Sequence, residues 1–279
     1  MAPARDAGPD TRKPPEKLPP PSNPTGPDDS GAVDPKTLYP PAWNREDNPR
    51  DASLDVASER YCDGLGTAWE FCWDFTDEAT AISGWNEVFD AGGTHEQFLG
   101  GGPPARQRAL RSTVLRSAGD GPHKVALRYL ITGLADNTQG FTLSFSFHVP
   151  LVETYAVIGA MALGNDVHGL AVYPTGCVAP PCLGESTHGP PPQPDVVNRR
   201  PFDQNAWYRA AIQYVPKLVG GKVTWGATIT VGGVVVGTRE ADAFPAADVY
   251  PSAANLFVGV FDTQTAGNTQ VELDDILVE

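Results

Sequence analysis

Phe141-Thr-Leu-Ser-Phe-Ser-Phe-His-Val149 is the stretch on which the fold prediction rests. Its odd positions are all apolar, and its even positions carry Thr142, Ser144, Ser146 and His148. A period of two places the large rings on one face of a strand and the small polar groups on the other. Three phenylalanine rings on one face need an opposing layer, so the stretch predicts an inner strand of a two-layer β protein.

The chain after about residue 65 carries the same signals. Over the whole chain, glycine (29 residues) and proline (28 residues) are abundant and 19% of residues are charged, which is typical of a turn-rich all-β protein. Val223, Trp225, Ile229 and Val231 share one parity, and we expect them to pack with the phenylalanines inside the sandwich. We predict an all-β fold, an antiparallel two-sheet β-sandwich of the jelly-roll type. The other predicted strands are Trp69–Phe75, Trp85–Phe89, Leu110–Leu115, Lys124–Leu130, Tyr155–Leu163, Gly169–Tyr173, Trp207–Val215, Lys222–Val231, Val234–Thr238, Leu256–Phe261 and Val271–Val278.

The segments between strands predict three hairpins and one long loop. Gly119–Pro122, Asn165–His168 and Gly232-Gly233 each read as a turn between neighbouring strands. Residues 155–163 also fit a buried helix, but their aromatic and β-branched members favour a strand. Residues 175–205 are rich in proline and predict a long loop, which in a compact domain is usually functional or mobile.

Residues 1–50 differ in composition from the rest. They hold 13 of the 28 prolines, including Pro19-Pro20-Pro21, and few apolar residues. Such a segment cannot bury enough apolar surface to offset the entropy lost on ordering, so we predict a disordered Pro-rich linker. It is either a tail without a function of its own or a tether for the domain. Residues 51–279 are predicted to form the sandwich domain, with 51–60 as a short helix or an irregular lead-in.

Charge and hydropathy restrict the partners. The chain has 20 basic and 34 acidic residues; 7 and 8 of them lie in residues 1–50, which leaves 13 and 26 for the rest. This acidic balance argues against nucleic acid or an anionic membrane surface as a partner. No apolar run reaches the roughly 18 residues of a membrane span, and no apolar signal-peptide core is present. We expect a secreted or cell-surface protein whose signal peptide is not present in this chain.

The four cysteines form two close pairs in the sequence, Cys62 with Cys72 and Cys177 with Cys182. Neither spacing matches a common zinc pattern. We favour two local disulfides in an oxidising compartment over free thiols. The sequence by itself leaves the connectivity open.

Three features together resemble the concanavalin A-like lectin and glucanase family, including its laminin-G-like relatives. They are Phe71-Cys-Trp-Asp-Phe75 followed ten residues later by Trp85, the stretch Trp207–Ile212 running into a two-glycine hairpin, and the ending Glu272–Val278. The resemblance covers about residues 65–279. It implies a jelly roll with its first and last strands side by side. The Pro-rich leader resembles the stalk of secreted or lipid-anchored bacterial surface proteins, although the lipid-bearing cysteine is absent from this sequence.

The resemblance implies carbohydrate as the leading ligand class and a structural calcium ion as a cofactor. Calcium prefers hard oxygen ligands. Asp74, Asp77 or Glu78 near the first strand could share an ion with Asp274 near the last. The alternative is that Asp274 and Asp275 form a solvated strand end.

The sequence does not indicate a catalytic motif. Glu240-Ala-Asp242 and Glu272-Leu-Asp274 share the first spacing of the sandwich glucanases' acidic triplet but lack its third acid. Gly-x-Ser-x-Gly, His-Glu-x-x-His and a phosphate-binding loop are also absent. The five histidines occur singly, and we interpret each as a surface or loop residue; His168, beside Asp166, is the only one with an acid nearby in the sequence. We therefore favour a non-catalytic protein, and catalysis by paired carboxylates from separate strands stays open as the alternative.

The sequence predicts a secreted or surface-tethered, non-catalytic binding module for carbohydrate, such as a glycan or cell-surface polymer. The alternatives are a polysaccharide hydrolase or lyase on the same fold, and a structural or adhesive surface protein. Aromatic rings that stack on sugars could come from Trp43 or Trp207 as well as from the candidates below, although tryptophan in a sandwich more often lies in the core. The candidate ligand-binding residues are Trp85, His148, Tyr173, His188, Arg199, Arg200 and Asn205.

Overall fold

Strands account for nearly all the secondary structure described by the computed structural model. Helical structure in the described ranges is limited to 3-10 turns such as η3 (Arg116–Ala118), and none of it is long and apolar enough to cross a membrane. The all-β prediction is confirmed. The structure describes residues 40, 62, 71–73, 75, 84–99, 108–120, 122–132, 140–163, 166–188, 199–247, 253–261, 263 and 265–279, all within one compact unit, Asp34–Glu279.

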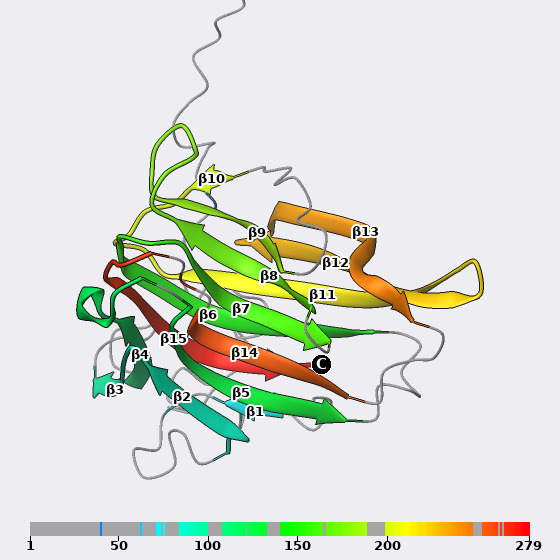
Figure 1. Ribbon diagram of the computed structural model, residues 1–279, viewed down its shortest axis with the longest axis horizontal. Helices are drawn as coiled ribbons and strands as arrows, with labels where there is room; N and C mark the ends of the chain where they lie inside the picture. The colour runs from blue at the N-terminus through cyan, green and yellow to red at the C-terminus, as the bar shows by residue number, and fades with distance from the viewer. Residues whose placement is uncertain are drawn as a thin grey trace, which may run out of the picture. The chain divides into compact units, whose positions relative to one another are not determined.

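Two antiparallel sheets stack as layers (Figure 1). In the described part of the chain, sheet A has the strand order β13-β12-β11-β6-β15-β4-β3, and β1 pairs with the end of β15. The β1–β15 pairing agrees with the predicted neighbouring of the first and last strands. The strands of sheet A are β1 (Phe71–Trp73), β3 (Gly93–Leu99), β4 (Arg108–Val114), β6 (Phe141–Val152), β11 (Tyr208–Val219), β12 (Lys222–Val231), β13 (Val234–Ala247) and β15 (Thr269–Val278).

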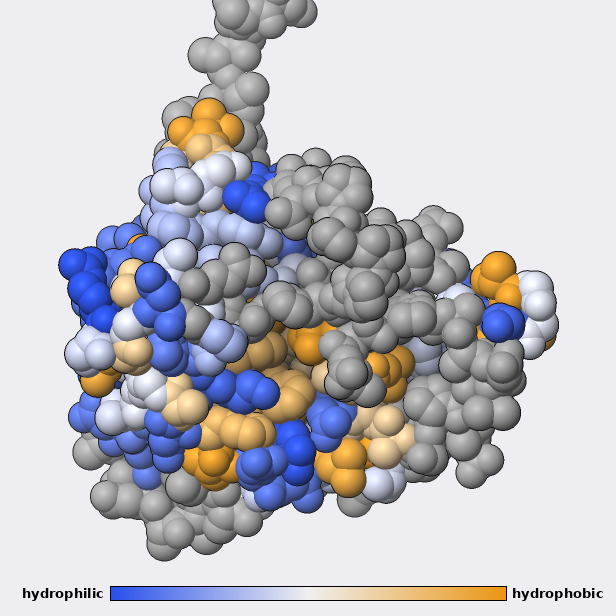
Figure 2. All heavy atoms as spheres, in the orientation of Figure 1, coloured by the Kyte–Doolittle hydropathy of each residue, from blue (hydrophilic) through white to orange (hydrophobic). Residues whose placement is uncertain are grey.

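Sheet B is the second layer, with the strand order β10-β9-β8-β7-β14-β5-β2. Its outward side carries a separate apolar cluster that includes Ala126, Phe257 and Phe261. Figure 2 shows hydrophobic side chains gathered over β5 and β14 on this side. The strands of sheet B are β2 (Glu87–Ala91), β5 (Lys124–Thr132), β7 (Ala156–Leu163), β8 (Asp166–Tyr173), β9 (Cys182–His188), β10 (Arg200–Pro201) and β14 (Ala253–Phe261).

The strand β6 lies in the middle of sheet A, and its odd-numbered residues Phe141 to Val149 are all buried, as predicted. Val223, Trp225, Ile229 and Val231 are buried too. They lie on β12 of the same sheet, so they share the interior with the phenylalanines without forming the opposing layer. That layer is sheet B. A Cβ added to Gly159 of β7 would lie 2.3 Å from Cζ of Phe145, so the glycine makes room for this ring.

Two of the predicted connections are wrong. The strands on either side of Gly119–Pro122 do not form a hairpin, because β4 pairs in sheet A and β5 pairs in sheet B. Residues 175–205 are not one loop, because β9 forms a full antiparallel ladder with β8 and β10 extends it. Both errors arise because a strand's partners depend on the whole sheet. The strand at 155–163 and the hairpin at 232–233 are confirmed. The strands on either side of Asn165–His168 pair as predicted, but Asp166, Val167 and His168 belong to β8 and not to the turn.

Both predicted disulfides are present, and they join Cys62 to Cys72 and Cys177 to Cys182. Residues 1–50 other than Pro40, and the predicted helix or lead-in at 51–60, lie outside the described residues. The boundary between linker and domain therefore stays a prediction.

The Tyr214 hydroxyl links the two sheets. It donates to the backbone carbonyl of His168 on β8 at 2.8 Å and accepts the backbone N–H of Met161 on β7 at 2.9 Å. Burial raises the pKa of Tyr214, so the hydroxyl keeps its proton and remains a donor.

Replacing Tyr214 with phenylalanine is expected to lower the free energy of unfolding by about 1–3 kcal/mol, since it strips buried backbone groups of a partner. Urea denaturation measures the loss. Tyr155→Phe is the control, because the half-buried Tyr155 bonds the Ser186 hydroxyl of sheet B and does not bridge two backbone groups as Tyr214 does, so this change should cost less than about 1 kcal/mol. Equal losses in the two variants would contradict the linking role of Tyr214.

A buried charge cluster joins the sheets where β13 meets β9. Oε1 of Glu185 accepts hydrogen bonds from Nε2 of His168, at 3.0 Å, and from Nε of Arg239 on β13. His168 is fully buried, so its interpretation as a surface turn residue is wrong. Burial raises the pKa of Glu185, but the hydrogen bonds and charges of His168 and Arg239 outweigh it and leave this pKa below its ordinary value.

Glu185→Gln is expected to make stability less dependent on pH. A carboxyl whose folded pKa is lowered stabilises the protein above its unfolded pKa, near 4.5, and this contribution disappears as the pH falls through the folded pKa. The difference in the free energy of unfolding between wild type and variant should therefore be largest at pH 7 and should shrink below pH 4.5. Urea midpoints at pH 7, 5, 4 and 3 measure it, and a gap of constant size would count against the cluster.

Candidate functional site

The outward face of sheet A carries a row of alternating acidic and basic side chains. Glu96 of β3 pairs in register with Arg111 of β4, Arg111 with Glu272 of β15, and Glu272 with His148 of β6. Their neighbours along each strand, such as Leu110, point into the core, so the period of two turns all four outward. We call these four residues the charge row.

Glu272 is the centre of the charge row. Its Oε1 accepts from Arg111 Nη2 at 2.7 Å and Nε at 3.1 Å, and its Oε2 lies 2.7 Å from His148 Nδ1. The Glu272 side chain is 6% exposed and that of Arg111 is 28% exposed. Burial raises the pKa of Glu272, but the hydrogen bonds and charges of His148 and Arg111 outweigh it, so this pKa lies below its ordinary value. Glu272 is therefore ionised at neutral pH.

Glu96 forms the open end of the charge row. Its Oε2 lies 3.6 Å from Nη1 of Arg111, and its side chain is 63% exposed. One guanidinium group thus contacts two carboxylates, of which Glu272 is buried and Glu96 faces solvent.

His148 connects the charge row to the loop before β11. Its Nε2 faces the backbone carbonyl of Gln204, and its ring lies 5.6 Å from that of Trp207, centroid to centroid, at an angle of 30°. Both ring nitrogens of His148 therefore face oxygen atoms of the protein. Trp207 is half-buried, which places an aromatic surface beside fixed polar groups.

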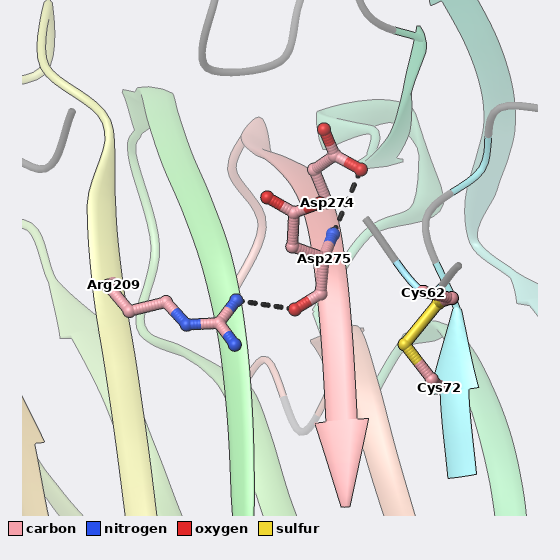
Figure 3. Close-up of a disulfide and its surroundings, with 5 residues drawn as sticks. All are labelled: Cys62, Cys72, Arg209, Asp274 and Asp275. Carbon is pink, nitrogen blue, oxygen red and sulfur yellow. Dashed lines mark hydrogen bonds between the residues drawn. A yellow bond between two sulfur atoms is a disulfide. The ribbon is translucent and has the colours of Figure 1, made fainter. Parts of the chain in front are cut away.

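A second polar group lies next to the charge row. Arg209 of β11 reaches across β6 to β15 (Figure 3), and its Nη1 donates to Oγ of Ser146, at 3.1 Å, and to the backbone carbonyl of Asp275. Asp275 lies in an irregularity of the β15–β6 pairing, with φ at 49°. Its N–H donates to Oδ1 of Asp274 at 2.9 Å, and both aspartates are buried.

Beyond these charged groups, the outward face of sheet A carries small, mostly half-exposed side chains and a buried apolar cluster of Leu277 with the Cys62–Cys72 disulfide. Ser144, Ala211 and Thr230 are cross-strand neighbours on β6, β11 and β12. Thr142 and Thr228 lie in the next row, on either side of the exposed Gln213. We call the whole outward surface of sheet A, including the charge row and Trp207, the polar face.

Of the predicted ligand-binding residues, only His148 and Asn205 lie at the polar face. Asn205 is exposed, in the same loop as Gln204 and Trp207, and its side chain donates to Oδ1 of Asp203. Two other predictions, Trp85 and Tyr173, are wrong as stacking rings, because each is only 7% exposed. Trp85 packs in the core beside Phe71, while the Arg199 guanidinium covers the ring of Tyr173.

The other predicted ligand-binding residues belong to sheet B. Arg200 lies on β10 and Arg199 directly precedes it. His188 ends β9, but its side chain lies outside the described residues. The predicted set therefore does not form one site.

The calcium prediction is untested. Asp74 and Asp77 lie outside the described residues, and Asp274 is buried within the polar face. Among the residues described, no group of three or more His, Cys, Asp or Glu side chains could hold a metal ion.

A serine, a histidine and an aspartate also meet at the edge of the sandwich. His95 Nδ1 lies 3.0 Å from Ser112 Oγ, and His95 Nε2 lies 3.6 Å from Asp90 Oδ1. These are the side chains of a nucleophilic triad, but Ser112 is fully buried, so a polymer could not reach its hydroxyl. Burial lowers the pKa of His95, against the smaller raising effect of Asp90. His95 also lies 3.1 Å from the Phe89 carbonyl and so links β3 to β2.

Sequence reasoning missed Arg111, Arg209 and Glu96, and it treated Glu272 only as part of an incomplete acidic triplet. It placed His148 correctly on the polar side of a strand, but it interpreted His95 and His168 as surface or loop residues, whereas both are strand residues that contact acids. Strand parity alone could have assigned Glu272 and Arg111 to an outward face. Their contact requires the strand order as well.

No family model matches this chain, and no curated protein sequence matches it. Similar solved structures include the alginate lyase Aly36B, with 9% identity over 75% of this chain and 96% of that one and a TM-score of 0.49. The catalytic domain of a glycoside hydrolase family 131 protein from Coprinopsis cinerea has 15% identity over 74% and 93%, with a TM-score of 0.40. A Bacillus subtilis protein with a galectin-like fold has 11% identity over 76% and 96%, with a TM-score of 0.36. Likeness of this degree assigns neither a ligand nor a reaction to this chain.

Proposed function

We propose that this protein binds carbohydrate on the polar face of sheet A. The observation that carries the proposal is the half-buried ring of Trp207 beside His148, at the end of a row of polar groups held by the buried Glu272. An aromatic ring offers an apolar surface to the C–H face of a sugar, and polar side chains already fixed in place lose little entropy when they bond its hydroxyl groups.

The setting fits an extracellular glycan partner. The two disulfides favour an oxidising compartment, where cell-surface polymers are found. Ser144, Ala211 and Thr230 lie farther along the same face, and their small side chains place no bulky group in the path of an extended chain of sugars. In this proposal the Pro-rich segment acts as a tether for the binding domain.

A glycan array with the wild-type chain tests the proposal, and Trp207→Ala identifies the face. The variant is expected to bind any array hit at least about tenfold more weakly, since a stacked ring contributes about 1.4 kcal/mol. Arg199→Ala, which changes sheet B beside Tyr173, should bind as wild type does. Loss of binding in Arg199→Ala but not in Trp207→Ala would place the site on sheet B. An array without hits, together with self-association in sedimentation, would favour an adhesive role.

A second candidate function is glycan cleavage. The observation in its favour is that Glu272 and Glu96 contact one guanidinium group from separate strands, which brings two carboxylates close together. Release of reducing sugar from polysaccharides that score on the array would establish it. Release that persists unchanged in Glu272→Gln would show that this pair does not do the chemistry.

A further inference from the structure

We infer that the polar face selects neutral glycans over uronate or sulfated ones, and that Glu96 is the residue that sets this preference. The inference rests on the proposed function and adds the ligand class. It follows from the contacts of the basic groups in the charge row and of Arg209, from the acidic charge of the domain, and from the exposure of Glu96.

The basic groups of the charge row and the neighbouring Arg209 are already engaged by the protein itself. Arg111 contacts Glu272 and Glu96, His148 contacts Glu272 and the Gln204 carbonyl, and Arg209 contacts Ser146 and the Asp275 carbonyl. Recognition of carboxylate or sulfate groups in proteins relies on guanidinium groups whose forked donors are turned to the ligand. An anionic sugar would have to compete with these internal acceptors.

The charge of the domain also opposes an anion. Within the charge row the carboxylates of Glu96 and Glu272 face one guanidinium group and one imidazole, while Lys217 and Lys222 lie farther along the same face, towards the β11–β12 turn. At longer range, residues 51–279 hold 26 acidic and 13 basic residues, so the field of the domain repels a polyanion.

Glu96 is the acidic group that a ligand meets first. It is 63% exposed, at the end of the charge row away from Trp207, and it lies opposite Arg111 on the strand pair β3–β4. A carboxylate accepts hydrogen bonds from sugar hydroxyl groups but offers no donor to a carboxylate or a sulfate. The same group therefore favours a neutral sugar and disfavours a charged one.

Paired polymers test the inference. Neutral polysaccharides are each compared with their own carboxymethylated form by affinity electrophoresis or titration calorimetry at low salt. We expect wild type to bind the neutral member at least tenfold more tightly. Glu96→Gln should reduce this ratio at least threefold with little change in the unfolding midpoint. Glu87→Gln removes the same charge from β2 of sheet B and should leave the ratio unchanged.

The possible outcomes distinguish carbohydrate binding from the preference for neutral glycans. Equal or tighter binding of the carboxymethylated form would overturn the inference while keeping carbohydrate binding. An unchanged ratio in Glu96→Gln, or equal reductions in both variants, would overturn the assignment of selectivity to Glu96. Binding to neither member of any pair would overturn the proposed function and the inference together.

Discussion

Replacing Phe145 with alanine is expected to lower the free energy of unfolding by about 3–5 kcal/mol. Phe145 is fully buried at the middle of β6, its ring lies 5.8 Å from that of Phe147, and it reaches across to Gly159 of β7. The alanine variant loses the burial of the ring and leaves a cavity that rigid strands on both sides cannot close. Equilibrium denaturation in guanidinium chloride measures the loss.

Leu218→Ala is the matched control for this truncation. Leu218 is 69% exposed near the turn between β11 and β12, so its replacement should change stability by less than about 0.5 kcal/mol. A loss below about 1 kcal/mol in Phe145→Ala would mean that the interior between β6 and β7 is not packed as described.

The second large effect is expected at Glu272. Glu272→Ala should lower the free energy of unfolding by about 2–4 kcal/mol, because it removes the buried carboxylate that both Arg111 and His148 contact. Denaturation at pH 7 measures the loss.

Glu96→Ala is the control for Glu272→Ala, since it removes a carboxylate from the same guanidinium group. The Glu96 side chain is exposed and 3.6 Å away, so this change should cost less than about 1 kcal/mol. Similar costs for the two variants would show that burial does not distinguish Glu272 from Glu96.

The inward faces of the strands were predictable from the sequence because burial imposes a period of two on each strand. Phe141–Val149 shows it plainly, and residues 223–231 repeat it. The assignment of strands to sheets was harder. The segment at Gly119–Pro122 reads as a hairpin turn, yet β4 and β5 separate into different layers, and local turn chemistry does not encode that separation.

The site was less predictable than the fold for a physical reason. Glu96, Arg111, Glu272 and His148 contact one another only because β3, β4, β15 and β6 are neighbours, and Arg111 and Glu272 are 161 positions apart in the sequence. For two aromatic residues, by contrast, the sequence suggested an exposure that the structure does not have. Trp85 and Tyr173 looked like rings for stacking, but Trp85 belongs to the core and a guanidinium group covers Tyr173.

The most direct test of carbohydrate binding on the polar face is a crystal structure of the protein with a neutral oligosaccharide chosen from the array. The account predicts a sugar ring stacked on Trp207, with hydroxyl groups bonded to members of the charge row. A sugar bound on sheet B, beside Tyr173 and Arg199, would contradict it.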